Sequence, residues 1–364
     1  MNVKATLASG GNVPKMRIRM AVVMAALGAV AAFMILPAAV GALAAVPASR
    51  AILAATPPLA KGSYNNVMVP RAKMTMAEDI TDSGLIVGCF QRKTGPERGF
   101  TDMHGRFMFI THRSAAGQSA TTCALSANSL GVIVGYYENH SGVMHGFVYQ
   151  KGVFTTINAP GAGRRSGEGT SAIDINKAGV IVGLYITSKD VVHGFVLSHG
   201  KFTRVDDPNA AHSSAGGTFL NGIADDGTIS GGYTDASLRS HGFWLRQGRF
   251  HQVDVPGARN TFVGCISDRS GLLVGGYQVR GHRRLVGFTY HQRVFRTLRD
   301  PSATGSTDPQ CGNDRSRVVG FYTNTLNVRT GFRFTPGASL AGVPGVRAGT
   351  GQGRLPFSPR VGRP

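Results

Sequence analysis

Three histidines recur at the same place in a repeated segment and could hold a metal ion. His145, His193 and His241 each open a His-Gly-Phe tripeptide. If the repeats form a ring and the tripeptide lies two strands out from the centre, equivalent histidines stand well over about 10 Å apart. One ion needs its imidazole nitrogens at about 2 Å. We therefore predict a structural hydrogen bond for each histidine, and we expect no metal site and no other cofactor.

Two basic groups are the candidate binding residues. Arg164 and Arg165 follow a Pro-Gly-Ala-Gly segment, and a second group is formed by Arg280, His282, Arg283 and Arg284. Arginine forks suit phosphate, uronate or carboxylate groups. The alternative is solvated loop charge that keeps a glycine-rich protein soluble. Nucleic acid is a less attractive partner, because the aromatic residues follow the repeat and are not interleaved with these basic loops.

Catalytic motifs are mostly missing, and no catalytic residue is predicted. The chain has no His-Glu-x-x-His, no Gly-x-Ser-x-Gly and no phosphate-loop Gly-Lys-Ser/Thr segment. Acidic residues do occur in several expected loops, at Glu138, Glu168, Asp190 and Asp235. A glycosidase needs two carboxyl groups at a defined separation. A carbohydrate-active hydrolase or lyase therefore stays open as an alternative.

These residues lie on a segment that occurs six times. A glycine that closes an apolar step recurs every 44 to 48 residues, at Gly88, Gly135, Gly183, Gly231, Gly275 and Gly320. A Gly-Phe pair follows, with its phenylalanine at Phe100, Phe147, Phe195, Phe243, Phe288 and Phe332. This period is typical of a propeller blade of four antiparallel strands. We expect the phenylalanines, and the aromatic residue two positions after each glycine, to pack between blades.

The sixth repeat lacks its fourth strand, and the missing strand lies at the other end of the chain. Residues 62–72 align without a gap on residues 152–162, which include a predicted fourth strand. Such an offset joins the first and last blades and leaves no free edge. The sequence therefore predicts an all-β fold, a six-bladed β-propeller at 62–335, with almost no helix after residue 60.

The repeat resembles a known family. Ile-Val-Gly-x-Tyr, His-Gly-Phe and Pro-Gly-Ala (160–162 and 256–258) together are similar to the bacterial extracellular repeat family named after its His-Ala-Phe (HAF) tripeptide. This chain has Gly where that tripeptide has Ala, and three repeats lack the His. The resemblance implies export and a propeller-like fold, and it implies no catalytic residues.

The two ends of the chain differ in composition from the repeats. Basic residues precede an apolar run from Met20 to Leu36, and Ala42-Leu43-Ala44 offers a processing site. We predict a signal peptide at 1–44, with an uncleaved membrane anchor as the alternative, a linker at 45–61, and a disordered basic Gly/Pro-rich tail at 336–364. The formal charge is +20. About half of it lies in these ends, so the repeats keep a basic excess that favours anionic partners.

Four cysteines are too few for a disulfide framework. Cys265 and Cys311 occupy similar places in consecutive repeats and could face each other across neighbouring blades. Buried free thiols are the favoured interpretation, and a Cys265–Cys311 disulfide is the alternative.

The expected binding surface follows from the order of the strands. In a four-stranded meander the second turn and the connection to the next blade lie on one face, and these are the segments of variable length. We therefore predict an exported, non-enzymatic binding or scaffold propeller that uses this face, for an envelope partner or an anionic polysaccharide. A purely structural surface protein is the remaining alternative.

Overall fold

The computed structural model describes residues 62–337 with short gaps at 116–120, 215, 325 and 327. Within these residues the chain forms strands and turns and no helix, so no described helix could span a membrane. The predicted signal peptide or anchor (1–44), the linker (45–61) and most of the predicted tail (from residue 338) lie outside the described residues.

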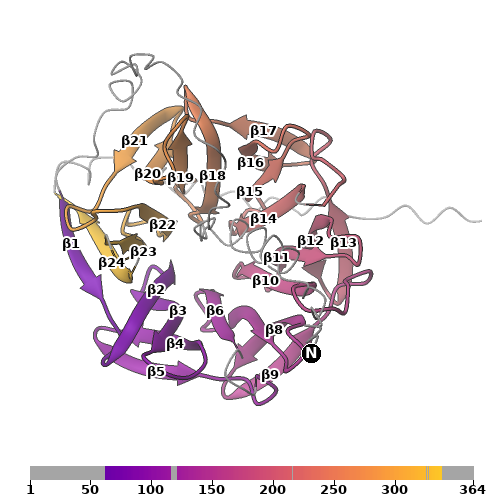
Figure 1. Cartoon of the computed structure of the whole chain (residues 1–364), viewed down its shortest axis with the longest axis horizontal. Helices are drawn as coiled ribbons and strands as arrows, with labels where there is room; N and C mark the ends of the chain where they lie inside the picture. Colours follow the sequence, from indigo (N-terminus) through magenta and orange to yellow (C-terminus); the bar gives the residue numbers. More distant parts are fainter. Residues whose placement is uncertain (1–61, 116–120, 215, 325, 327, 338–364) are drawn as a thin grey trace, which may run out of the picture.

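The strands form six four-stranded antiparallel blades around a central axis (Figure 1), and single parallel bridges join blades 2, 3 and 4. Within each blade the strands are given from the axis outward. Blade 1 consists of β2 (Ala72–Ile80), β3 (Leu85–Arg92), β4 (Arg98–Met103) and β5 (Arg106–Ile110). Blade 2 consists of β6 (Thr122–Ala127), β7 (Ile133–Glu138), β8 (Met144–Gln150) and β9 (Val153–Ile157). Blade 3 consists of β10 (Gly169–Ile175), β11 (Ile181–Ile186), β12 (Val192–Ser198) and β13 (Lys201–Val205).

The remaining three blades repeat this order, and the last one closes the ring. Blade 4 consists of β14 (Gly217–Ile223), β15 (Ile229–Thr234), β16 (Ser240–Arg246) and β17 (Arg249–Val253). Blade 5 consists of β18 (Ala258–Ile266), β19 (Leu273–Val279), β20 (Val286–His291) and β21 (Val294–Leu298). Blade 6 consists of β22 (Thr307–Gly312), β23 (Val318–Thr323), β24 (Arg329–Pro336) and, as its outermost strand, β1 (Gly62–Val67).

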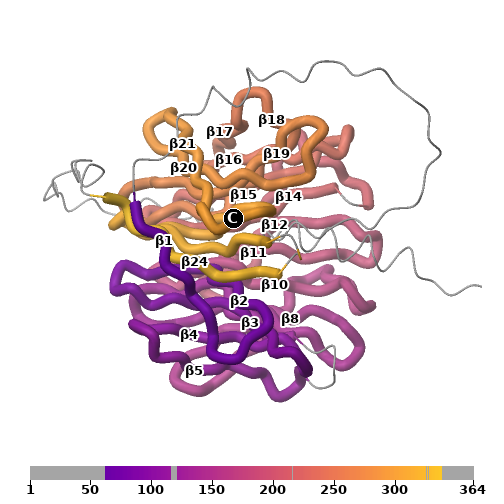
Figure 2. Tube along the Cα trace, turned by 60° about the vertical axis from the view of Figure 1, so that its left-hand side comes forward, coloured from indigo at the N-terminus to yellow at the C-terminus, as the bar shows by residue number. Residues whose placement is uncertain are grey.

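The N-terminal strand completes the last blade, as the sequence predicts. β1 runs antiparallel to β24, from Gly62 opposite Pro336 to Val67 opposite Gly331, and Figure 2 shows the two strands side by side. The ring of Tyr64 lies 4.9 Å from that of Phe334 and 5.7 Å from that of Phe332, between ring centroids. The predicted six-bladed propeller is confirmed, and its closure joins the two ends of the described chain.

Rings from the third strands fill the space between the blades. The six repeated phenylalanines are fully buried, with no exposed surface on any of them. The six aromatic residues two positions after the repeated glycines are buried as well: Phe90, Tyr137, Tyr185, Tyr233, Tyr277 and Tyr322. These twelve rings belong to the apolar clusters of the described chain, which is where packing residues are expected.

Two disulfides link neighbouring blades. Cys89 of β3 bonds Cys123 of β6, and Cys265 of β18 bonds Cys311 of β22, with 5.1 Å between the α-carbons of each pair. The prediction of buried free thiols is therefore wrong for all four cysteines, and the Cys265–Cys311 alternative is confirmed. Cys89 and Cys123 lie on different strands of their repeats, so the spacing of the repeat did not show that they meet.

The two faces of the ring differ in the length of their loops. We call the face with the first and third turns of each blade the short-turn face, and the face with the second turns and the blade-to-blade connections the long-loop face. Each third turn has two residues, whereas the connections range from four residues between β17 and β18 to eleven between β9 and β10. The first turns have four to six residues and the second turns have five or six. The prediction of long second turns is therefore wrong, and the length variation on the long-loop face comes from the blade-to-blade connections alone.

Candidate ligand-binding groove

The repeated histidines make hydrogen bonds within their own blades. His145 Nδ1 lies 2.8 Å from Asn158 Oδ1, His193 Nδ1 lies 2.9 Å from Asp206 Oδ2, and His241 Nδ1 lies 2.6 Å from Asp254 Oδ2. In each case the partner stands thirteen residues further along the chain and follows the fourth strand. Each imidazole also lies against the repeated tyrosine of its blade, at 4.9 to 5.2 Å between ring centroids. The predicted structural role of these histidines is confirmed.

The predicted basic residues are exposed on the long-loop face. Arg164 and Arg165 belong to the connection between blades 2 and 3, and Arg280, His282, Arg283 and Arg284 form the second turn of blade 5. All six side chains are exposed. Blades 2 and 5 stand on opposite sides of the ring (Figure 1), so the structure does not bring the two groups into one site.

Two of the four loop carboxylates, Glu168 and Asp235, accept hydrogen bonds within their own loops. Glu168 is fully buried and accepts a hydrogen bond from the backbone N–H of Arg165. Asp235 accepts hydrogen bonds from the backbone N–H groups of its own turn and lies 3.2 Å from His241 Nε2. Asp190 takes a left-handed backbone conformation in the equivalent turn of blade 3. Glu138 is half-buried at the end of β7, and its charge adds to the effect of burial in raising the pKa of Glu97.

The axis is lined by carboxyl groups from the first strands of three blades. A cavity of about 60 Å³ on the axis is lined by, among others, Glu78, Asp79, Asp174 and Asp308. Its volume is that of about two water molecules, which is too small for a sugar ring.

Asp79 and Asp174 share one hydroxyl group between them. Ser126 Oγ lies within hydrogen-bonding distance of both carboxylates, but its single proton can be donated to only one of them. Burial raises the pKa of each aspartate to about 6. Asp79 also accepts the backbone N–H of Ala127 in blade 2, and Asp174 that of Ile223 in blade 4. These two residues therefore join three pairs of first strands around the axis.

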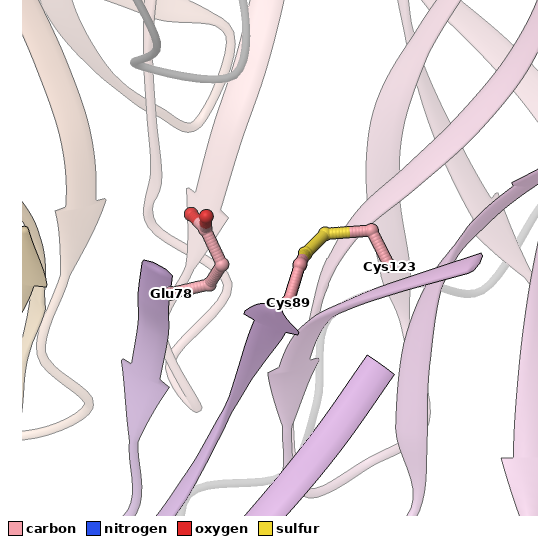
Figure 3. A group of neighbouring side chains, drawn as sticks. All are labelled: Glu78, Cys89 and Cys123. Carbon is pink, nitrogen blue, oxygen red and sulfur yellow. A yellow bond between two sulfur atoms is a disulfide. The ribbon is translucent and has the colours of Figure 1, made fainter. Parts of the chain in front are cut away.

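The pKa of the Glu78 carboxyl lies far above its usual value. Burial raises its pKa to about 8, the Glu97 carboxylate adds to the shift and the Arg329 guanidinium opposes it. Its carboxylate and the sulfur atoms of Cys89 and Cys123 lie within 4.8 Å of one another (Figure 3). The two sulfurs are bonded to each other, and a disulfide offers no thiolate to a metal ion. The group is therefore not a metal site in the oxidised protein.

The raised pKa of Glu78 predicts a stability that falls as the pH rises. In the unfolded chain this carboxyl titrates near pH 4.5, whereas in the folded protein it keeps its proton up to about pH 8. Between these values folding takes up a proton, so each increase in pH favours the unfolded state. We expect this one carboxyl group to lower the free energy of unfolding by roughly 2 kcal/mol between pH 5 and pH 8, after allowing for the partial exposure of the side chain.

The Glu78→Gln variant tests this dependence. The amide keeps the shape of the protonated acid and does not titrate in this range, so the variant should show a flatter pH profile in urea unfolding and be more stable than the wild type at pH 8. Asp102→Asn is the control, because Asp102 lies in β4, away from the axis, and accepts a hydrogen bond from the turn at Gly105. An unchanged slope in Glu78→Gln would contradict the assignment.

A groove of about 500 Å³ opens between blades 4 and 5 on the short-turn face. One wall comes from β16 and β17, with Trp244, Arg246 and His251, and the other comes from β20 and the third turn of blade 5, with Tyr290 and Arg293. The Trp244 and His251 rings stack at 3.7 Å with 10° between their planes. Aromatic walls beside arginines combine an apolar surface with oriented hydrogen-bond donors, which is the usual composition of a small-molecule site.

The charged side chains that line the groove sum to a small net positive charge. Arg246, Arg269 and Arg293 line it together with Asp226 and Asp268. Arg246 Nη2 lies 3.2 Å from Asp226 Oδ2, which orients this guanidinium. Burial and then the neighbouring Asp225 and Asp174 raise the pKa of Asp268 to about 7. Three arginines against two aspartates, one of them half protonated near neutral pH, leave an excess of one to two positive charges.

The third turn of blade 5 departs from the repeat at this groove. In blades 1 to 4 the second residue of this turn is a glycine with positive φ, at Gly105, Gly152, Gly200 and Gly248. In blade 5 the position is Arg293, with φ 65°. An L-residue with a Cβ costs about 1 kcal/mol more than glycine in this conformation. The arginine side chain is therefore placed in the groove against the backbone preference of the turn.

Sequence reasoning missed this groove, although two signals pointed to it. Trp244 is the single tryptophan of the chain, and it stands at the repeat position that carries Val148 and Val196 in blades 2 and 3. Arg293 interrupts the Lys-Gly or His-Gly pattern of the third turns. Both are departures from the repeat, and both lie on the short-turn face, whereas length variation directed attention to the long-loop face.

The comparisons with known proteins support the fold. No family model and no curated protein matches the chain. Among solved structures, AofleA from Arthrobotrys oligospora is 12% identical, with 77% of this chain and 87% of that chain covered and a TM-score of 0.50. The fucose-recognising lectin of Aleuria aurantia, a six-bladed β-propeller, is 12% identical over 75% of this chain and 98% of that chain, with a TM-score of 0.46.

An enzyme stands among the similar structures beside these fungal proteins. XC5397 from Xanthomonas campestris, described as a gluconolactonase, is 14% identical over 79% of this chain and 93% of that chain, with a TM-score of 0.44. At such identities the likeness extends to the fold and not to the function. The protein is a six-bladed β-propeller with neighbouring blades joined by disulfides, and its function has to be argued from its own site.

Proposed function

We propose that the protein is an exported, non-enzymatic binding propeller whose ligand is an acidic glycan, held in the groove between blades 4 and 5. The observation that carries the proposal is Arg293, which occupies a left-handed glycine position beside Trp244 and Tyr290. A non-glycine residue in this conformation is held there by the surrounding structure, and such residues cluster at binding sites. The carboxylate of a uronate matches the small positive excess, and a sugar ring matches the aromatic walls.

Export is supported by the two disulfides, since such bonds persist in oxidising compartments. The apolar run at Met20 to Leu36 fits a signal peptide, or an anchor if it is not cleaved. Membership in the His-Ala-Phe repeat family belongs to the same proposal, because the repeat motifs match its pattern. The exposed arginines of the long-loop face, at Arg164, Arg165, Arg280, Arg283 and Arg284, are a second candidate surface for the same acidic ligand.

The test measures the binding of alginate oligomers, whose sugar units are uronates. Neutral dextran oligomers serve as the uncharged comparison. Wild-type protein should bind alginate with an affinity that falls as salt is added, and Trp244→Ala should bind about tenfold or more weakly. Arg293→Gly should lose affinity and gain about 1 kcal/mol of stability, because it restores the glycine of the turn. No new reducing ends should appear, which distinguishes binding from hydrolysis.

The controls decide between the two faces. Gly152→Arg places an arginine in the equivalent turn of blade 2, and it should lose stability without changing alginate binding. If Arg283→Ala with Arg284→Ala abolishes binding while Trp244→Ala does not, the site lies on the long-loop face. Equal affinity of the wild type and Arg293→Gly would remove the main support for the groove.

A further inference from the structure

A second cavity lies at blade 1, on the long-loop face. It has a volume of about 360 Å³ and is lined by Phe90, Thr94 and Pro96 together with four cationic side chains: Arg71, Arg92, Lys93 and Arg98. The lining contains no carboxylate. Within the described part of the chain, none of the four cations forms an ion pair.

The antiparallel ladder brings these cations together from three segments. Arg92 ends β3 and Arg98 begins β4, where it stands opposite Phe90. Arg71 precedes Ala72, whose register partner is Arg92. Lys93 begins the turn between β3 and β4. The cluster is therefore a product of strand register, and its members repel one another unless an anion lies between them.

Aromatic rings hold one of the guanidinium groups in place. Arg92 Cζ stands 6.0 Å from the centroid of the Phe90 ring and 5.8 Å from that of the Phe109 ring, and the two rings lie 4.9 Å apart. These distances are within the range of cation–π attraction. An arginine that is positioned in advance loses less entropy when it binds an anion.

Arg71 stands where equivalent turns of the repeat have glycine. Pro70-Arg71-Ala72 aligns with Pro160-Gly161-Ala162, and Gly161 has φ 87°. Arg71 has φ 62°, so it takes the same left-handed conformation with a side chain present. A glycine would be about 1 kcal/mol more favourable there. The arginine is thus kept at a cost in the turn, and its side chain lines the cavity.

We propose that this cavity binds a phosphate or sulfate monoester carried on a larger molecule. Four cations without a carboxylate match a group of charge near −2 better than they match the single charge of a uronate. This distinguishes the blade 1 cavity from the groove between blades 4 and 5, where aspartates offset most of the positive charge. The volume exceeds that of a phosphate ion and leaves room for part of the body that carries it.

The experiment uses the full chain and compares glucose 6-phosphate with glucose and glucuronate by isothermal titration at low salt. Glucose 6-phosphate should bind, glucose should not, and glucuronate should bind about tenfold more weakly than the phosphate. Inorganic phosphate and vesicles containing phosphatidic acid are parallel probes. Preference for vesicles assigns the group to a lipid headgroup, and preference for glucose 6-phosphate assigns it to a phosphorylated sugar.

Three variants connect the binding to this cavity. Arg92→Gln with Arg98→Gln should weaken glucose 6-phosphate binding about tenfold or more. Arg71→Gly should weaken it while the protein becomes more stable, so a loss of binding there does not reflect unfolding. Arg106→Gln with Arg249→Gln removes the same charge from exposed strand positions and should leave binding unchanged.

Two outcomes would overturn the proposal. One is equal binding of glucose and glucose 6-phosphate. The other is an equal loss in the control pair and in the Arg92 and Arg98 pair, because attraction to general surface charge would then explain the binding. Trp244→Ala should not affect glucose 6-phosphate, so failure of this proposal and failure of the groove proposal are separable.

Discussion

Replacing Asn65 and Asn66 together by proline is expected to lower the free energy of unfolding by more than about 3 kcal/mol. Both residues lie in β1 opposite Phe332 and Arg333 of β24. In an antiparallel pair, alternate residues donate their N–H to the neighbour, so one of the two prolines must remove a bond of the closing ladder. Loss of β1 would uncover Phe332 and Phe334, which are 0% and 2% exposed.

The matched control replaces the same two residues by alanine. Their side chains are exposed, so the alanine pair should change the stability by no more than about 0.5 kcal/mol. Urea unfolding followed by tyrosine and tryptophan fluorescence measures both variants. If β1 closes the ring, the proline variant should unfold at a much lower urea concentration than the alanine variant. Similar midpoints for the two would show that β1 contributes little to the stability of the ring.

Gly135→Ala is the second change with a large expected effect, at about 3 kcal/mol of lost stability. Gly135 lies on β7 between β6 and β8, and a Cβ built there would lie 1.9 Å from the carbonyl oxygen of Cys123 and 2.9 Å from the ring of Phe147. Neither neighbour can move freely. The oxygen belongs to the backbone of the innermost strand, and the ring is fully buried.

Gly131→Ala, in the same blade, separates this effect from backbone strain. Gly131 has φ 76°, and its built Cβ meets nothing within 4 Å. That variant should lose only about 1 kcal/mol, from the left-handed conformation alone. In thermal and urea unfolding, Gly131→Ala should therefore be clearly more stable than Gly135→Ala. The reverse order would mean that the first strand can shift to accept a side chain.

These two predictions explain why so much of the fold could be predicted. The repeated glycine marks the place where a first-strand carbonyl and a third-strand ring meet, and both contacts lie within one blade. Each is set by residues that are near in sequence, so a repeat of fixed internal spacing carries them. The closing strand was predictable for the same reason, because Tyr64 to Pro70 is the fourth-strand segment of the repeat at a displaced position.

The cysteine pairs mark the limit of that reasoning. Cys265 and Cys311 occupy equivalent strands, so their approach across two blades could be considered. Cys89 and Cys123 come from a second strand and a first strand, and their contact depends on how adjacent blades rotate against each other. Without that geometry, buried free thiols were the favoured interpretation of all four cysteines.

The groove and the blade 1 cavity depend still more on the assembled ring. The amino-acid sequence alone determined the number of blades, their strand order and the buried rings, because these follow from local spacing and from burial of the repeated apolar residues. Only the tertiary structure decided which departures from the repeat share a site. Trp244 and Arg293 belong to different blades, so blade packing brings their side chains together. Arg71 precedes β2 and Arg98 begins β4, so strand register brings these two together.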